Sequence, residues 1–294
     1  MKVAFYPGCV SKGACPELYV SAKAIAKPLG LELEELTEAP CTGAGVLGEQ
    51  NPDLADSLNG LTLAMAESKG ADLMTICSTC QGVLSSVNHG LANDQSRLAK
   101  VNSTIGDQGF RYGGHTKVKH LLWMLFEDIG FERVAAAVKR KLTGLKIAPF
   151  YGCYILRPAE ALGLRERPER KTYLERLIAL LGAEPVEYRG ATKCCGFPML
   201  TFNREKSLSM AGNHILEAKD KGADLLVTPC PLCHLNLDGQ QPDAARVLQK
   251  PIGVPIFHLP QLLGLAFGCE PEELRLNHHV VPTKGALEKV ELKV

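Results

Sequence analysis

The stretch Lys193-Cys194-Cys195-Gly196-Phe197-Pro198 places two cysteines side by side, followed by glycine and proline. A disulfide between adjacent cysteines is strained, because it closes an eight-membered ring through one peptide bond. Two neighbouring thiolates can instead bind one metal centre. Gly196 would let the backbone approach that centre without a Cβ, and Pro198 would stiffen the chain after it. The doublet therefore predicts a metal site.

Three further cysteines accompany the doublet. Forty residues separate Cys153 from the doublet, and thirty-four residues separate the doublet from the Cys-x-x-Cys pair Cys230 and Cys233. A Cys-x-x-Cys pair alone is ambiguous, since redox pairs and zinc sites share it. Five thiols exceed the four ligands of a closed structural zinc site. The set therefore favours an iron–sulfur cluster over zinc or buried structural cysteine.

The first half of the chain repeats this pattern. Residues 3–9 resemble residues 147–153, and residues 69–73 resemble residues 221–225. A constant offset of 153 residues relates three pairs of cysteines: Cys41 and Cys194, Cys77 and Cys230, Cys80 and Cys233. The sequence therefore predicts an internal duplication of one long unit, not a solenoid.

The doublet is broken in the first half, because Thr42 stands where the offset places the second cysteine. A threonine hydroxyl is far too weak an acid to replace a thiolate. The four remaining cysteines could hold a cubane [4Fe-4S] cluster, a smaller iron–sulfur cluster or Zn²⁺; they are Cys9, Cys41, Cys77 and Cys80. Cys15 could supply a fifth thiol, or it could be a small buried residue, as we expect for Cys269.

Alternating strand and helix patterns predict an α/β fold with two duplicated halves, 1–144 and 145–294. Each half should form a small, largely parallel sheet with flanking helices. The cysteines should lie at the carboxyl ends of the strands, where open α/β sheets place ligands. We expect strands at 2–6, 31–36 and 72–76, and helices at 17–26, 52–69 and 115–129. From about residue 270 the chain is polar, and we expect a tail that wraps a partner or stays mobile.

Several histidines and tyrosines near the cysteines allow both a structural and a functional interpretation. His120 and His258 lie on apolar segments that we expect to be helical, which favours core or capping roles. His234 directly follows Cys233 and could face the cluster as a proton donor. His278 and His279 are expected on a solvated tail. Tyr6 and Tyr151 precede the first cysteine of each half and could donate hydrogen bonds near the clusters or pack in the core.

The composition excludes several classes of function. The 294 residues carry a formal net charge of +1 and no long basic run, which argues against nucleic-acid binding. No segment has the pattern of a signal peptide or a transmembrane helix. Eleven cysteines in a chain expected to be cytoplasmic indicate metal or redox chemistry, since structural disulfides are rare there.

The cysteine pattern resembles the CCG motif of the B-type subunit of heterodisulfide reductase and its relatives over nearly the whole chain. The resemblance implies a noncubane [4Fe-4S] cluster bound by Cys153, Cys194, Cys195, Cys230 and Cys233, with substrate near Cys194, Cys195 and His234. Relatives include thiol:fumarate reductase, a subunit of some succinate dehydrogenases, and a heterodisulfide reductase-like complex of sulfur oxidisers. Since Thr42 breaks the first motif, we favour the sulfur-oxidiser branch.

The resemblance predicts an oxidoreductase subunit that performs disulfide and thiol chemistry on a small sulfur substrate. No Gly-x-Gly-x-x-Gly motif follows a strand, so electrons should arrive from partners. The family implies a ferredoxin-like iron–sulfur subunit and a flavoprotein subunit. The alternative is a zinc- or cluster-binding subunit that has a structural or electron-relay role and no substrate site of its own.

Overall fold

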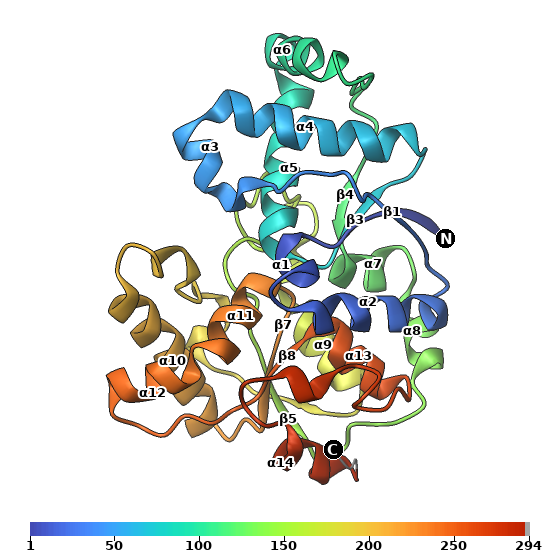
Figure 1. Cartoon of the computed structure of the whole chain (residues 1–294). Coiled ribbons are helices and arrows are strands. Elements are labelled where there is room, and N and C mark those ends of the chain that lie inside the picture. Colours follow the sequence, from blue (N-terminus) through green and yellow to red (C-terminus); the bar gives the residue numbers. More distant parts are fainter. Residues whose placement is uncertain (292–294) are drawn as a thin grey trace.

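A computed structural model describes residues 1–291 and contains two four-stranded sheets in which every strand pair is parallel (Figure 1). The strand order is β2-β1-β3-β4 in the first sheet and β6-β5-β7-β8 in the second. The strands are β1 (Lys2–Tyr6), β2 (Glu32–Glu35), β3 (Leu73–Thr75), β4 (Val118–His120), β5 (Lys146–Pro149), β6 (Glu184–Pro185), β7 (Leu225–Thr228) and β8 (Ile256–His258). The predicted α/β fold with duplicated parallel sheets is confirmed.

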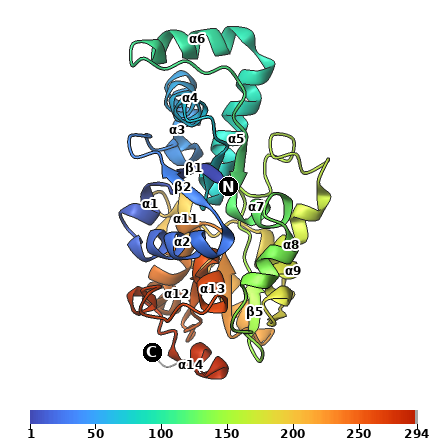
Figure 2. The same ribbon diagram turned by 90° about the vertical axis from the view of Figure 1, so that its right-hand side faces the viewer.

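Helices flank both sheets. Those of the first half are α1 (Cys9–Lys12), α2 (Pro16–Leu29), α3 (Val46–Gln50), α4 (Pro52–Ser68), α5 (Ser78–Asn93), α6 (Gln95–Gly106), α7 (Leu121–Glu127) and α8 (Phe131–Ala137). Those of the second half are α9 (Tyr173–Leu180), α10 (Arg204–Asp220), α11 (Pro231–Gly239), α12 (Gln241–Leu248), α13 (Leu259–Ala266) and α14 (Lys284–Leu287). Helix α6 and the C-terminal segment lie at opposite ends of the molecule (Figure 2).

The duplication extends to the way the long helices begin. Asn51 caps α4 by accepting a hydrogen bond from the Leu54 amide at 3.1 Å, and Pro52 occupies the first helical position, where the predicted helix begins. Asn203 caps α10 in the same way, through the Lys206 amide at 3.0 Å. The shared cap indicates that both helices descend from one ancestral element.

The expected helix at 115–129 is wrong in its first part. Val118–His120 forms β4, which pairs in parallel with β3, and only Leu121–Glu127 is helical. A strand of three residues is too short to show its own hydrophobic period in the sequence. Its state is decided by pairing with β3, which no local pattern reveals.

The expectation for the C-terminal tail is also wrong. Residues 270–291 pack against the rest of the chain, with Leu274, Leu276, Val281 and Leu287 buried. His279 is buried as well, which contradicts its expected place on a solvated tail. His278 is exposed. The apolar residues of this segment are spaced irregularly among polar ones and show no helical period, which is why the sequence pattern predicts a solvated tail.

The two halves share their hydrophobic cores. Helix α2 of the first half packs on α13 of the second (Figure 1), and both buried clusters contain side chains from each half. Arg170 of the second half donates hydrogen bonds to both carboxylate oxygens of Glu127 in the first half, at 2.7 and 2.8 Å. Such bidentate, buried pairs fix geometry strongly. The halves therefore form one folded body, and their division at residue 144 stays a prediction.

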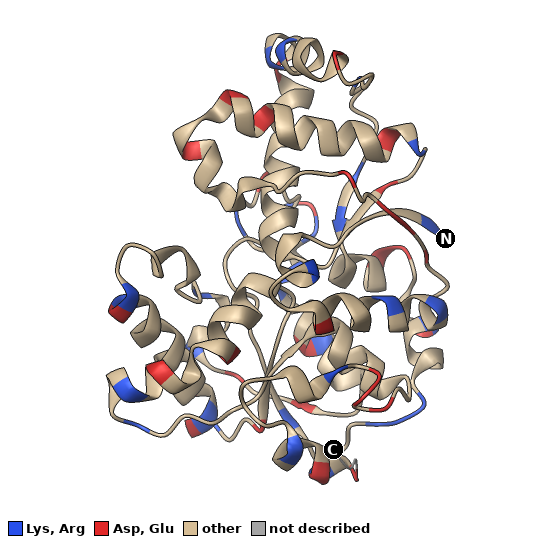
Figure 3. Ribbon diagram, viewed as in Figure 1, with Lys and Arg blue, Asp and Glu red and all other residues tan. Residues whose placement is uncertain are grey.

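Charged residues of both signs are interspersed over the residues drawn in Figure 3, without a basic face in that view. None of the helices in residues 1–291 combines the length and apolarity needed to cross a membrane.

Two buried histidines join the halves at the ends of their strands. His120 Nε2 lies 2.8 Å from the carbonyl oxygen of Pro229, and His258 Nε2 lies 2.9 Å from that of Ile76. Burial lowers the pKa of His120 to about 4 and that of His258 to about 3, so both rings are neutral and Nε2 donates. Each residue ends a strand and caps the following helix, which confirms the core and capping roles but corrects the expectation of helical segments.

We predict that His258→Ala destabilises the protein by roughly 2–4 kcal/mol, because the substitution leaves a cavity and an unpaired buried carbonyl at Ile76. Chemical unfolding followed by circular dichroism measures the change. His89→Ala removes a histidine whose side chain is 45% exposed, and it should change stability by less than about 0.5 kcal/mol. Equal effects of the two substitutions would contradict the role of His258.

Candidate metal centres

The four cysteines of the first half lie just past the carboxyl ends of β1, β2 and β3. Cys9 begins α1, Cys41 follows β2, and Cys77 and Cys80 lie at the amino-terminal end of α5. The sulfur atoms of Cys9 and Cys41 are 3.6 Å apart, and the Cys80 amide donates a hydrogen bond to the Cys77 sulfur at 3.4 Å. The parallel sheet thus gathers thiols that are far apart in the sequence.

The second half repeats the arrangement with five cysteines. Cys153 follows β5, the doublet follows β6, and Cys230 and Cys233 lie at the amino-terminal end of α11. Cys195 is close enough to both Cys194 and Cys233 for their thiols to interact. All eleven cysteines are free thiols. A set of five convergent thiols fits an iron–sulfur cluster, whose usual ligands are thiolates.

Hydrogen bonds within each set lower the pKa of particular thiols, namely Cys41 in the first set and both Cys194 and Cys230 in the second. The bond with Cys153 lowers the pKa of Cys194 to about 2, and the bond with Cys9 lowers the pKa of Cys41 to about 6. These two cysteines are equivalent in the duplication. Soft metals bind the thiolate, so both sets are ready for a soft metal centre.

Glycines keep space open beside the thiols. Gly8 and Gly152 have φ angles of +82° and +71°, and a Cβ on them would lie 3.2 Å from the Cys80 sulfur and 3.0 Å from the Cys233 sulfur. Gly196 has another role than the one expected from the sequence. A Cβ on Gly196 would lie 2.8 Å from the Ser207 carbonyl oxygen, so this glycine is needed for packing against α10.

The two cysteine sets meet at the boundary between the halves. The sulfur atoms of Cys77 and Cys230 are 4.0 Å apart, and the Thr79 hydroxyl lies 3.4 Å from the Cys230 sulfur. The Ser78 amide donates to the Pro229 carbonyl at 3.3 Å. The carboxyl edges of the two sheets therefore face each other, and the two ligand sets meet at the buried Cys77 and Cys230, whereas Cys9 and Cys41 of the first set are exposed.

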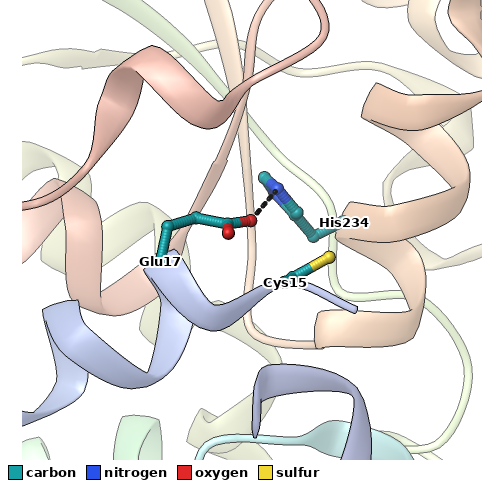
Figure 4. Close-up of side chains that lie close together, drawn as sticks. All are labelled: Cys15, Glu17 and His234. Atoms are coloured by element: carbon teal, nitrogen blue, oxygen red, sulfur yellow. Dashed lines mark ion pairs between the residues drawn. The ribbon is translucent and has the colours of Figure 1, made fainter. Parts of the chain in front are cut away.

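Thr42 lies within the first set, where it is buried with its hydroxyl oxygen 3.9 Å from the Cys80 sulfur. Cys195 has the equivalent neighbour, Cys233, in the second half. Cys15 lies elsewhere, beside Glu17 and His234 (Figure 4). Cys269 is half-buried at the edge of a hydrophobic cluster, as expected for a packing residue.

The other candidates are placed as follows. Tyr6 donates a hydrogen bond to the Pro40 carbonyl at 2.8 Å, which holds the loop that carries Cys41. Tyr151 donates to Glu175 at 2.5 Å and so binds a carboxylate outside the cysteine set. His234 lines a cavity with Cys15 and Glu17, and it is not among the residues that surround the cysteine doublet. The role of His234 as a proton donor to a substrate stays a prediction.

An apolar hollow of about 50 Å³ adjoins the second set. Its walls include side chains from both halves: Ala44, Val46, Thr79, Cys153, Tyr154, Cys194, Cys195, Phe197, Pro198, Leu232 and Cys233. Sequence reasoning missed Tyr154, although it directly follows Cys153. Val46 and Thr79 could not be found from the sequence, because they reach this hollow only through the docking of the first half.

Comparison with known proteins shows that both halves match the same family model. The CCG profile, described as a cysteine-rich domain, matches residues 3–85 and 147–238. The chain is 36% identical over 278 residues to the 8-methylmenaquinol:fumarate reductase membrane anchor subunit of Wolinella succinogenes, covering 95% of this chain and 96% of that protein. It is 31% identical to a protein of Archaeoglobus profundus named as similar to the B-type subunit of heterodisulfide reductase, with 93% of each chain covered.

A third relative is the B-type subunit of the ferredoxin/F(420)H(2)-dependent CoB-CoM heterodisulfide reductase of Methanosarcina acetivorans, at 28% identity over 98% of this chain and 97% of that protein. Among solved structures, a hypothetical protein from Helicobacter pylori has the same fold, with a TM-score of 0.78 at 16% identity. The match covers 95% of this chain and 52% of that one. Both CCG profile matches include the cysteine sets described above. The chain therefore belongs to the CCG cysteine-rich domain family and is a homologue of the B-type subunit of heterodisulfide reductase.

Proposed function

We propose that the chain is the iron–sulfur subunit of a heterodisulfide reductase-like complex and that it performs disulfide and thiol redox chemistry at the second cysteine set. The observation that carries the proposal is the convergence of five thiols beside an apolar hollow. A closed zinc site needs four ligands and no adjoining hollow.

Cys153, Cys194, Cys195, Cys230 and Cys233 would hold a noncubane [4Fe-4S] cluster. Such a cluster, when bound, supplies iron atoms that can bind sulfur and accept or donate single electrons. The chain supplies further control through hydrogen bonds to the sulfur ligands, such as the one from the Gly196 amide to the Cys194 sulfur at 3.4 Å. Hydrogen bonds of this kind tune the reduction potential of iron–sulfur centres.

The apolar hollow would exclude water from the reacting sulfur atoms. Tyr154, Phe197, Pro198 and Leu232 form much of its wall, and Val46 contributes from the other half. Excluding water strengthens electrostatic interactions in a site and prevents side reactions. The substrate class that suits these apolar walls is a small thiol or disulfide with an apolar group next to sulfur, and the hollow of about 50 Å³ would have to widen to admit it.

Cys9, Cys41, Cys77 and Cys80 would hold the second centre, a cubane [4Fe-4S] cluster, a smaller iron–sulfur cluster or zinc. The 4.0 Å contact between Cys77 and Cys230 places the two ligand sets side by side, which an electron-relay role requires. Disulfide reduction needs two electrons, whereas iron–sulfur centres transfer one at a time. Two adjacent centres would meet this requirement.

The alternative function is an electron-relay or structural subunit without its own substrate site. The small volume of the hollow, about 50 Å³, favours this alternative, because a substrate would need the walls to move apart. Metal analysis separates a zinc protein from the iron–sulfur subunit. Binding of a thiol or disulfide to the isolated chain separates the substrate-binding subunit from the relay. The assignment to sulfur oxidisers stays a prediction, since the relatives described above are named for fumarate and CoB-CoM reductases.

We predict that Cys195→Ser leaves the chain folded but removes or converts the centre of the second set. Serine keeps the size of the side chain while removing the fifth thiolate. Iron content and EPR spectra of the anaerobically purified protein measure the effect. Cys269→Ser is the matched control and should leave both unchanged. Wild-type iron content and spectra in Cys195→Ser would contradict the assignment of Cys195.

We predict that Thr42→Cys shifts the first centre toward the spectroscopic type of the second, because it restores the five-thiol pattern at a buried position 3.9 Å from the Cys80 sulfur. EPR of the reduced and oxidised proteins measures the shift. Thr42→Val has a similar size without a thiol, so it separates ligation from packing. Two identical centres in the wild-type protein would refute the argument from Thr42.

We predict that the chain works in a cytoplasmic complex with a ferredoxin-like iron–sulfur subunit and a flavoprotein subunit, because nothing in its sequence matches a nucleotide-binding fingerprint. Affinity purification from the native host, followed by mass spectrometry, should recover both partners. Full turnover by the isolated chain, with a reduced nicotinamide cofactor as the only electron donor, would argue against this assembly.

A further inference from the structure

A second group of metal-binding side chains lies outside both cysteine sets. Cys15, Glu17 and His234 each offer one donor atom, and these atoms all lie within 4.8 Å of one another (Figure 4). Cys15 and Glu17 come from the start of α2 in the first half, whereas His234 comes from α11 in the second. The three residues are therefore brought together only by the docking of the two halves.

All three side chains are withdrawn from solvent, with 5% of Cys15, 5% of Glu17 and 2% of His234 exposed. Among residues 1–291, His234 is the one basic side chain within 4.0 Å of a Glu17 oxygen: its Nε2 lies 3.7 Å from Oε1, and the contact is an ion pair only when the ring is protonated. His234 Nδ1 is buried without a hydrogen-bond partner in the described structure. Buried carboxylates and imidazoles normally have partners, because burial without one costs free energy. The first turn of a helix favours an acidic residue, but it does not explain why Glu17 is buried.

The cluster has room for an ion and for an additional ligand. It opens into a cavity of about 140 Å³ whose walls include Cys15, Glu17, His234 and Asp238. Asp238 already accepts hydrogen bonds from the Val280 amide at 2.7 Å and the Val281 amide at 3.3 Å. His279 Nε2 lies 2.9 Å from Gln261 Nε2. Both oxygens of Asp238 and Nε2 of His279 are therefore engaged, whereas Nδ1 of His279 has no hydrogen-bond partner in the described structure. His279 is not among the residues that line the cavity, so Cys15, Glu17 and His234 are the donor set that faces it.

We propose that Cys15, Glu17 and His234 form a site for one divalent zinc-like cation that links the two halves of the chain. Sulfur, nitrogen and carboxylate oxygen are the three donor types that Zn²⁺ binds in proteins. One thiolate and one carboxylate balance the two positive charges of the ion, which removes the cost of burying them singly. A water molecule from the cavity completes four-coordination. Asp238 lies close to His234, with the donor atoms of the two side chains within 4.8 Å of each other.

The position of the site suggests what the ion does. His234 directly follows Cys233, and α11 carries this part of the second cysteine set on its first turn. An ion held between α2 and α11 fixes the orientation of α11 relative to the first half. The role is therefore structural and distinct from that of the two cysteine sets.

The experiment compares zinc and iron per chain in the full-length protein, purified anaerobically with its iron–sulfur centres and washed with a weak chelator. The variants are Cys15→Ala, Glu17→Gln and the control Cys269→Ala. We expect wild type and Cys269→Ala to hold about one zinc per chain more than Cys15→Ala. We expect Glu17→Gln, which keeps the size of the side chain, to bind zinc at least about tenfold more weakly. Iron should be equal in all four proteins.

Zinc bound by Cys9, Cys41, Cys77 and Cys80 would be present in every variant, so the difference between variants reports only the new site. Anomalous diffraction at the zinc edge should give a peak between Cys15 and His234. Equal zinc in wild type and folded Cys15→Ala, or a crystal of zinc-treated protein without that peak, would overturn the proposal. If Cys15→Ala does not fold, Glu17→Gln and the anomalous signal decide. Equal zinc in iron-containing proteins would refute only this site, whereas absence of iron from all four proteins would refute the proposed function.

Discussion

The structure depends on the way the carboxyl edges of two parallel sheets meet. Each half brings its cysteines to that edge, because parallel strands place all their carboxyl ends on one side. His120 and His258 then donate across the boundary to Pro229 and Ile76. These two hydrogen bonds satisfy carbonyl groups that are buried away from water, and they hold Cys77 and Cys230 within 4.0 Å of each other.

Contacts among the thiols and across this junction explain much of the site's chemistry. Hydrogen bonds among the thiols lower the pKa of Cys41 and Cys194, so each set contains a thiolate ready for a soft metal. The second set also adjoins a hollow that Val46 and Thr79 help to close from the other half. Neither half could form this environment alone, because a separate half would leave its cysteine edge in water.

The duplication is not fully symmetric, and two of the differences concern cysteines. Thr42 replaces the second thiol of the doublet while keeping its buried position beside Cys80. Cys15 has no thiol at its counterpart, Ala159, and it faces α11 of the other half. Because the two halves share a fold but differ in their cysteine sets, two centres of different type can lie side by side. An electron-transfer subunit can use that difference, since cluster type and hydrogen bonding set reduction potential.

The sequence by itself determined the duplication, the parallel α/β class, the helix starts at Asn51 and the membership of each cysteine set, because spacing, caps and hydrophobic period are local properties. Only the tertiary structure decided that Val118–His120 is a strand, that residues 270–291 pack on the core and that Gly152 lies beside Cys233 while Gly196 packs on α10. It also brought Cys15 and Glu17 to His234, more than two hundred residues away. Those outcomes depend on contacts between the halves, and the free energy of such contacts leaves no mark in any short stretch of sequence.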